Sequence, residues 1–331
     1  MVQSLSRATS YVETYCVRVD NGERVVRAHA TGFFLRAEQA LLFITNWHVV
    51  TGLDPAKPSV ASGPTPSFMK LTVCSKAGWL TELTAPLYDR KMAPLWKEHP
   101  EGPAVDAVIY PLPRRLEDHF VFVDIQDAVS DTEIDDTVAK DVFILGYPFS
   151  KEEMKSSFGI NAAYYLPIWK RGSIATEPRV RLGGRILLID SLSRPGMSGA
   201  PVVIAQDEKM VHATDARNSA ILGLIRRGEI AARDAIRGLD AQSLRIATEK
   251  QFNFLGLYSG VIGNTRLQQV ALGKCWHFDT LRELAANHRP GVMPYHSPMP
   301  NQFYEAFIDD LAGGELIRKN VHGEIVERVP L

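Results

Sequence analysis

The sequence predicts a mostly β fold with a few added helices, built as a β-sandwich or as a pair of barrels. Strand-length apolar runs, rich in aromatic and β-branched residues, are separated by Gly, Pro and polar turns. No sustained helical period occurs before residue 112, and the strand pattern resumes after residue 140. Many short strands with turn signals between them are typical of sandwiches and barrels, so we expect two groups of strands.

The first group of strands is expected within residues 1–115. The Asn21-Gly22 pair marks a tight hairpin between Val17 and Val25. The segment 54–66 contains four prolines and is expected to be a surface loop. The strand-length runs of this half are 15–19, 32–35, 41–45, 70–74 and 107–110.

The second group is expected within residues 116–290, with runs at 142–145, 172–175, 186–189, 202–204 and 254–258. Between the last two runs lies a segment, 207–251, that we interpret as a partly helical insertion. Residues 230–237 are good helix formers and support this interpretation. The insertion is either an inert surface elaboration or an element that restricts access to a site and docks a regulatory partner.

A C-terminal helix and an extension complete the chain. Thr280 is followed three residues later by Glu283, and this capping-box arrangement predicts a helix from Thr280 to about Asn287. Arg289, Pro290 and Gly291 follow it and are expected to end it. Residues 291–331 then form a C-terminal extension.

Composition excludes several classes of function. The 331 residues carry a net charge of −1, which gives no reason to expect nucleic acid or an acidic membrane surface as a partner. No run is long enough for a membrane span, and residues 1–20 lack the apolar core of a signal peptide. Cys16, Cys74 and Cys275 are widely spaced, which indicates reduced thiols in a cytoplasmic protein. The nine histidines form no HExxH or close cluster, so neither metal nor cofactor is expected.

One loop points to chemistry on a serine. Ser198 stands between Gly196 and Gly199, and Pro195 and Pro201 flank them. Glycines permit positive φ values, so such a loop can direct two backbone N–H groups to a point beside a hydroxyl. Acyl transfer on an activated serine requires this arrangement, although the same residues could form a simple turn between two strands.

A serine nucleophile needs a base and an acid that orients the base. His48 follows the apolar run 41–45, and Asp106 precedes the run 107–110. Taken singly, each is more often a turn, cap or core residue than a catalytic one. Their combination with Ser198, in the order His, Asp, Ser, favours a catalytic site.

These contexts resemble the chymotrypsin-like serine proteases, closest to the HtrA-type and bacterial trypsin-like peptidase branch. The similar segments lie in the right order between about residues 31 and 272. They are 45–50 (TNWHVV), 105–108 (VDAV), 145–149 (LGYPF) and 195–201 (PGMSGAP). The α/β-hydrolase motif GxSxG is not matched, because Ala200 stands where its second glycine belongs.

The resemblance implies two six-stranded antiparallel β-barrels, the first with His48 and Asp106 and the second with Ser198. It implies a catalytic triad of these three residues and an oxyanion hole formed by the N–H groups of Gly196 and Ser198. The residues implied to bind substrate are Leu192, Ser193, Ser259, Gly260 and Val261. Of these, Ser259 is also implied to support Asp106, and Gly260 and Val261 are implied to pair with the substrate backbone.

Departures from the family pattern restrict the function further. Met197 precedes the serine where activated zymogens carry an aspartate, so activation through an ion pair with a new N-terminus is not expected. Leu192 stands at the base of the primary pocket, where no carboxylate attracts Lys or Arg. A medium apolar or small residue at the cleavage position is the better prediction.

We therefore predict a metal-independent serine endopeptidase that acts on specific cytoplasmic protein targets through an acyl-enzyme. One alternative is a catalytically idle trypsin-fold module that binds a peptide or regulates a partner. A second alternative is a capsid-like or viral polyprotein protease with a single cognate site.

Overall fold

A computed structural model gives the fold. It describes residues 4–18, 20–38, 40–60, 63–125, 138–159, 166–192, 194–226, 229–262, 272–293, 315–320 and 324–330. The chain is mostly β, with one closed six-stranded antiparallel barrel, one large antiparallel sheet and few helices. It separates into two compact units: Met1–Ile204 with Phe254–Leu331, and Ala205–Asn253.

The first half of the chain builds the large sheet. Its order is β15-β6-β7-β3-β2-β1-β4-β5-β16-β17, and β8 pairs in parallel with β2. The hairpin between β1 and β2 has the turn expected at Asn21-Gly22. The strands are β1 Thr9–Val17, β2 Arg24–Ala37, β3 Ala40–Thr45, β4 Phe68–Cys74, β5 Leu80–Pro86, β6 Lys97–Glu98, β7 Val108–Leu112, β8 Val123–Asp124, β15 Arg289–Pro290, β16 Glu315–Lys319 and β17 Ile325–Pro330.

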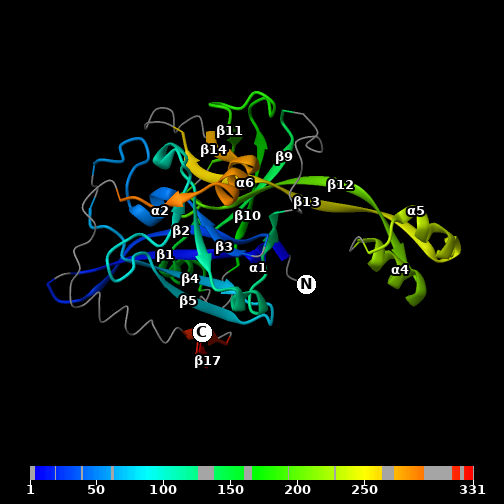
Figure 1. Ribbon diagram of the computed structural model, residues 1–331, viewed down its shortest axis with the longest axis horizontal. Helices are drawn as coiled ribbons and strands as arrows, with labels where there is room; N and C mark the ends of the chain where they lie inside the picture. Colours follow the sequence, from blue (N-terminus) through cyan, green and yellow to red (C-terminus); the bar gives the residue numbers. More distant parts are fainter. Residues whose placement is uncertain are drawn as a thin grey trace. The chain divides into compact units, whose positions relative to one another are not determined.

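The second half builds the barrel, closed in the order β10-β11-β14-β13-β12-β9. Figure 1 shows its green, yellow and orange strands above the blue and cyan strands of the sheet. The strands are β9 Asp141–Gly146, β10 Ile168–Ile174, β11 Ile186–Asp190, β12 Pro201–Ala213, β13 Leu244–Val261 and β14 Leu272–His277.

Of the two six-stranded barrels that the resemblance implied, the described residues form one, and the first half forms an eleven-stranded sheet in place of the other. Strands from the C-terminal part of the chain extend both edges of this sheet. β15 pairs with β6 at one edge, and β16 pairs with β5 at the other. An unpaired edge strand carries unsatisfied N–H and C=O groups, so these additions satisfy groups that β5 and β6 would otherwise present. The extension expected at 291–331 thus contributes strands β16 and β17 to the first half of the fold.

Alternating side chains fill the two cores. In the barrel, Val142 and Ile144 of β9 face Val202 and Ile204 of β12, and all four are fully buried. In the sheet, Trp47 and Trp96 are among the largest buried side chains of a separate core. Each half therefore packs around its own apolar cluster.

The helices of the first unit are short, and one begins earlier than expected. Helix α6 begins at Phe278 with His277 as its N-cap, so the prediction of a start at Thr280 was wrong. Phe278, Leu281 and Leu284 are buried at helical spacing, and this burial decides where the helix begins. The others are α1 Ser4–Ala8, α2 Trp47–Thr51, η1 Gly102–Ala104, η2 Arg114–Asp118 and α3 Lys151–Phe158, while α6 ends at Ala286.

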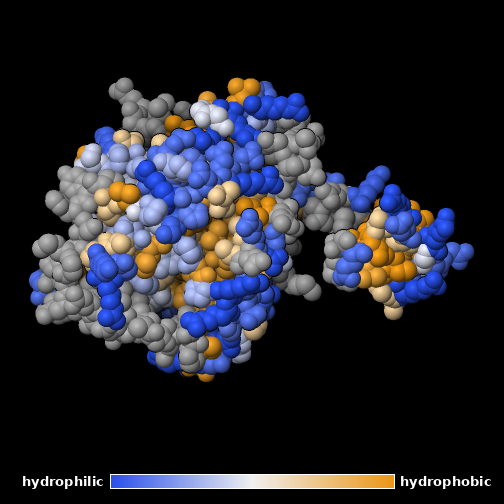
Figure 2. Space-filling view, viewed as in Figure 1, coloured by the Kyte–Doolittle hydropathy of each residue, from blue (hydrophilic) through white to orange (hydrophobic). Residues whose placement is uncertain are grey.

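The second unit covers the segment expected as an insertion at 207–251. Its helices are α4 Ala216–Arg226, α5 Ala232–Ala235, η5 Ile236–Gly238 and η6 Ala241–Ser243. Asn218 is fully buried there. Its Nδ2 donates to Asp240 O at 2.8 Å, and its Oδ1 accepts from Asp240 N at 3.1 Å. Apolar side chains gather on one face of this unit (Figure 2), and Ile236 and Ile246 are exposed. A regulatory partner at 207–251 stays a prediction.

None of the helices in the described ranges is long and apolar enough to cross a membrane.

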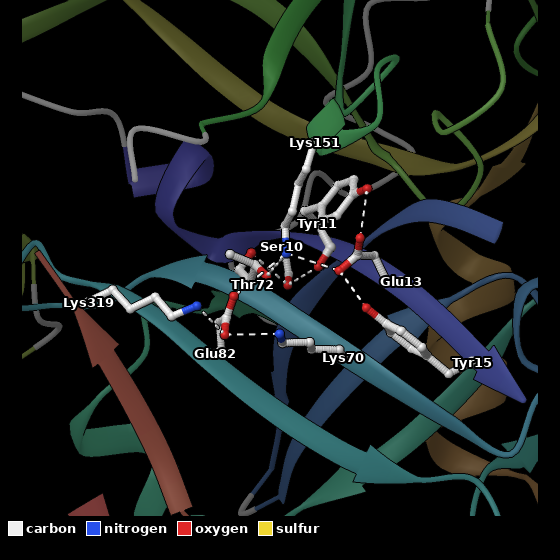
Figure 3. A network of polar contacts seen from close by, with 9 residues as sticks. All are labelled: Ser10, Tyr11, Glu13, Tyr15, Lys70, Thr72, Glu82, Lys151 and Lys319. Carbon is white, nitrogen blue, oxygen red and sulfur yellow. Dashed lines mark hydrogen bonds and ion pairs between the residues drawn. The ribbon is translucent and has the colours of Figure 1, made fainter. Parts of the chain in front are cut away.

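Two buried carboxylates connect the sheet with helix α3 (Figure 3). Glu82, on β5, lies 3.1 Å from Lys70 Nζ and 2.8 Å from Lys319 Nζ of β16. Lys151, at the start of α3, lies 3.6 Å from Glu82 and 3.0 Å from Glu13 of β1. Because α3 follows the barrel strand β9, the ion pairs of Lys151 connect the barrel to the sheet.

The three lysines decide the ionisation of Glu82. Burial raises the pKa of this carboxyl, but Lys70, Lys319 and Lys151 together outweigh burial, so the pKa is lowered from its ordinary value. A lowered pKa in the folded state stabilises the fold above the ordinary pKa of about 4.5. That stability is lost as the pH falls through the pKa of the folded state.

We predict that Glu82→Gln lowers the free energy of unfolding at pH 7 by about 2–3 kcal/mol. Three cationic groups, which are only partly exposed, then lose their common partner. The variant should also lose less stability than the wild type as the pH falls below about 4.5. Urea unfolding at a series of pH values measures both effects. Glu152→Gln, an exposed change on α3, is the control, and equal stabilities of the Glu82 and Glu152 variants would contradict the assignment.

Candidate active site

Strand pairing brings His48 and Asp106 together. Thr45 ends β3 and pairs with Val108, which begins β7, so the residues just beyond these two positions face each other. His48 lies on α2, and its Nδ1 is 2.8 Å from Asp106 Oδ2. The backbone N–H of His48 also donates to Asp106 Oδ1 at 3.0 Å. The carboxylate therefore fixes both the position of the residue and the rotation of its ring.

Two further groups hold Asp106, which is only 2% exposed, one at its backbone and one at its carboxylate. Asn46, fully buried, donates from Nδ2 to the backbone oxygen of Asp106 at 2.7 Å. The hydroxyl of Ser259 donates to Asp106 Oδ2. Ser259 was expected in this role, whereas Asn46 was not. Asn46 lies within the TNWHVV segment, but the sequence does not show what its amide contacts.

Ionisation of the pair follows from these contacts. Burial raises the pKa of Asp106, but His48 and then the Ser259 hydroxyl lower it by more than burial raises it. The net pKa lies below its ordinary value, so the carboxyl is ionised. Burial lowers the pKa of His48, and Asp106 more than reverses this effect, so the pKa of His48 is raised. A carboxylate can only accept hydrogen bonds, so the neutral ring carries its proton on Nδ1. Nε2 is then left as a proton acceptor.

The loop around Ser198 requires its glycines. Gly196 has φ +95° and Gly199 has φ +84°, which side chains rarely adopt. A Cβ at Gly196 would lie 2.2 Å from the Tyr147 carbonyl oxygen, and one at Gly199 would lie 2.0 Å from that of Thr31. The glycines are therefore needed both for the turn and for the close approach of neighbouring backbone.

Three carbonyl groups of this loop are hydrogen-bonded inward. Gly196 O accepts from Thr31 Oγ1 at 2.7 Å, Met197 O accepts from Ala200 N at 3.0 Å, and Ser198 O accepts from Thr31 N at 2.8 Å. Within the described part of the chain, the N–H groups of Gly196 and Ser198 donate to no acceptor. The loop thus leaves two neighbouring donors free for an external oxygen.

Thr31 is the main link between this loop and the sheet. It is fully buried on β2, and besides holding the two loop carbonyls its Oγ1 accepts from Tyr147 N at 3.1 Å. The Thr45 hydroxyl in turn donates to Thr31 O at 2.8 Å. Sequence reasoning missed Thr31, because its partners lie far away along the chain and a threonine in a strand is an ordinary residue.

Ser198 lies next to the strand that carries Ser259. A Cβ at Gly260 would lie 3.9 Å from Ser198 Oγ, so the hydroxyl points toward this strand. No hydrogen bond joins Ser198 Oγ to His48 in the described ranges. Bonds of this kind often form only when substrate binds.

The other expected substrate residues differ in their surroundings. Gly260 lies with Ser259 in a bulge of β13 opposite β14, and Val261, just after the bulge, pairs with Gly273. Leu192 is 68% exposed at the approach to the loop. Ser193 lies outside the described residues. Met197, in contrast, is fully buried in the barrel core, where a Cβ at Gly146 would meet its sulfur at 2.9 Å.

Among the residues that the structure describes, no group of three or more His, Cys, Asp or Glu side chains could hold a metal ion.

The family described as "Trypsin-like peptidase domain" matches residues 30–211, which is more than half of the 331 residues. The match includes His48, Asp106 and Ser198. The chain therefore belongs to the trypsin-like peptidase family, and the resemblance inferred from the sequence is confirmed. No curated protein matches the sequence.

We predict that Thr31→Val destabilises the fold by about 1–3 kcal/mol, because it leaves the Gly196 carbonyl and the Tyr147 N–H buried without a partner. Thr31→Ser keeps the hydroxyl and is the matched control. Chemical denaturation of the two variants measures the difference. A Val variant as stable as the Ser variant would show that the hydroxyl does not hold the loop.

Proposed function

We propose that this protein is a serine endopeptidase, a trypsin-fold enzyme whose triad is Ser198, His48 and Asp106. One observation carries the proposal. Asp106 binds Nδ1 of the His48 ring, and within the described residues neither His48 Nε2 nor the N–H groups of Gly196 and Ser198 have a hydrogen-bond partner. Family membership supports a peptidase that acts on protein substrates in general.

In this mechanism the Ser198 hydroxyl attacks the carbonyl carbon of a peptide bond while His48 Nε2 takes its proton. Productive binding requires Ser198 Oγ to come within about 3 Å of Nε2. His48 then gives the proton to the leaving amine, and an acyl-enzyme forms on Ser198. Water, deprotonated by the same nitrogen, releases the second product. Asp106 stays ionised and stabilises the imidazolium in both steps.

The free N–H groups of Gly196 and Ser198 would stabilise the negative oxygen that develops on the attacked carbonyl. Removal of one such donor typically costs about 100- to 1,000-fold in rate. Thr31 contributes indirectly, because its hydroxyl donates to the Gly196 carbonyl and so fixes the peptide group between Gly196 and Met197.

Two features support our proposals for the substrate class and the compartment. Leu192 offers no carboxylate to a Lys or Arg side chain, which favours a medium apolar or small residue at the cleavage position. Cys16, Cys74 and Cys275 are free thiols, as expected for an enzyme of the reducing cytoplasm.

Cleavage and covalent labelling test the proposal together. We predict that the full chain hydrolyses members of a proteome-derived peptide library and that a fluorophosphonate probe labels it. Ser198→Ala should abolish both, since the nucleophile is lost. Asp106→Asn should lower kcat by about 10,000-fold, because the ring is held in the wrong tautomer.

The controls separate the alternatives. Circular dichroism should show that both variants remain folded. Labelling that persists in Ser198→Ala would overturn the assignment of the nucleophile. A wild-type chain that binds library peptides without labelling or cleavage would instead be an idle binding module. Cleavage confined to one sequence would indicate a single-site protease.

A further inference from the structure

Strand register places Lys274 beside the expected path of the substrate. Lys274 lies on β14, the neighbour of β13 in the barrel. Tyr258 pairs with Cys275 and Val261 pairs with Gly273, and the register shifts between them. Ser259 and Gly260 together therefore lie opposite the single residue Lys274, which is the geometry of a β-bulge.

Lys274 lies on the same face of the barrel as Ser259. Tyr258 and Cys275 are both fully buried in the barrel core, so their neighbours along the strands face outward. Ser259 uses this outer face to reach Asp106. The outward direction therefore takes Lys274 toward the triad. Its Nζ lies 5.9 Å from the centroid of the Trp276 ring, two residues along on the same face.

No side chain at Gly260 separates Lys274 from the reactive serine. Gly260 has φ +88°. A Cβ built on this glycine would have one described atom within 4 Å apart from those of the adjacent residues, and this atom is Ser198 Oγ at 3.9 Å. A long side chain opposite this glycine can extend over open space. On the side away from β14, Tyr258 exchanges backbone hydrogen bonds with Gly199 and Ala200, just before β12 begins at Pro201. We expect a peptide to add beyond this point, along Gly260 and Val261.

Lys274 carries a charge that the described residues do not neutralise. It is half-buried and forms no ion pair within the described ranges. Lys70, Lys151 and Lys319, by comparison, all contact Glu82. The charge of Lys274 also acts on His48. Burial lowers the pKa of His48, Asp106 raises it, and the positive charge of Lys274 lowers it. A half-buried cation that forms no ion pair with the described residues favours an anionic ligand.

We propose that Lys274 determines specificity by binding an acidic side chain on the acyl side of the scissile bond. This inference rests on the proposed peptidase function. Side chains of an added strand alternate between its two faces. With the side chain at the cleavage site directed toward Leu192, the second and fourth residues on the acyl side face His48 and Lys274. An aspartate or glutamate at one of these two positions meets the ammonium group.

Charge reversal tests this assignment. A cleaved library peptide is synthesised with Glu, Ala or Lys at the second and, separately, the fourth residue. For the wild type we expect kcat/KM to be about tenfold higher with Glu than with Ala at one position, and lower with Lys. Lys274→Glu should reverse this order, and Lys274→Met should abolish the preference for charge. The wild-type preference should shrink as salt is added.

Lys91→Glu, on an exposed turn between Asp89 and Ala93, is the matched control and should behave as the wild type. If Lys274→Glu and Lys274→Met both cleave with the wild-type order of preference, the inference is overturned while the peptidase function stands. If no variant cleaves any peptide and the fluorophosphonate labels none of them, the peptidase function fails and this inference fails with it.

Discussion

The geometry of the candidate active site depends on the hydrogen bonds of one buried threonine. Thr31, on strand β2 of the sheet, binds the carbonyl groups of Gly196 and Ser198 through its hydroxyl and its backbone N–H. Its own carbonyl accepts from Thr45, and Thr45 pairs with Val108 at the strand ends that position His48 and Asp106. The serine loop and the His–Asp pair are therefore placed by the same three neighbouring strands.

A second connection between the halves lies at helix α3. Lys151 at its start binds Glu13 and Glu82 of the sheet, while Tyr147, just before the helix, donates from its backbone to Thr31 Oγ1. The Tyr147 ring also packs edge to face against Tyr11 of β1. The C-terminal strand β16 joins this cluster through Lys319. A late part of the chain thus stabilises the sheet that supports the site.

The sequence predicted much of the candidate site because the requirements of such a site are local. A tight loop at Ser198 needs glycines with positive φ, a strand must end just before His48, and a strand must begin just after Asp106. All three features can be seen in a short stretch of residues. The mostly β class was equally visible, because strand-length apolar runs recur throughout both halves.

What the sequence did not predict depends on contacts between distant residues. The bond from Thr31 to Gly196 spans 165 positions, and nothing near either residue indicates it. The position of Lys274 opposite Ser259 and Gly260 follows from a register shift in β13, which a single sequence does not specify. The extension of the sheet by β15, β16 and β17 likewise depends on long-range pairing. Helix α6 began early because burial of Phe278 outweighed the local capping signal at Thr280.

In the proposed mechanism, Thr31 holds a loop whose N–H groups at Gly196 and Ser198 converge with the Ser198 hydroxyl and His48 on one reacting carbonyl. The most direct measurement is a crystal structure of the protein after reaction with a peptidyl phosphonate. We predict a covalent bond from phosphorus to Ser198 Oγ, with one phosphonyl oxygen about 2.7–3.1 Å from the backbone nitrogens of Gly196 and Ser198. Thr31 Oγ1 should still bind Gly196 O, and His48 should still bind Asp106. An adduct on another residue, or a Gly196 N–H directed away from the phosphonyl oxygen, would contradict the account.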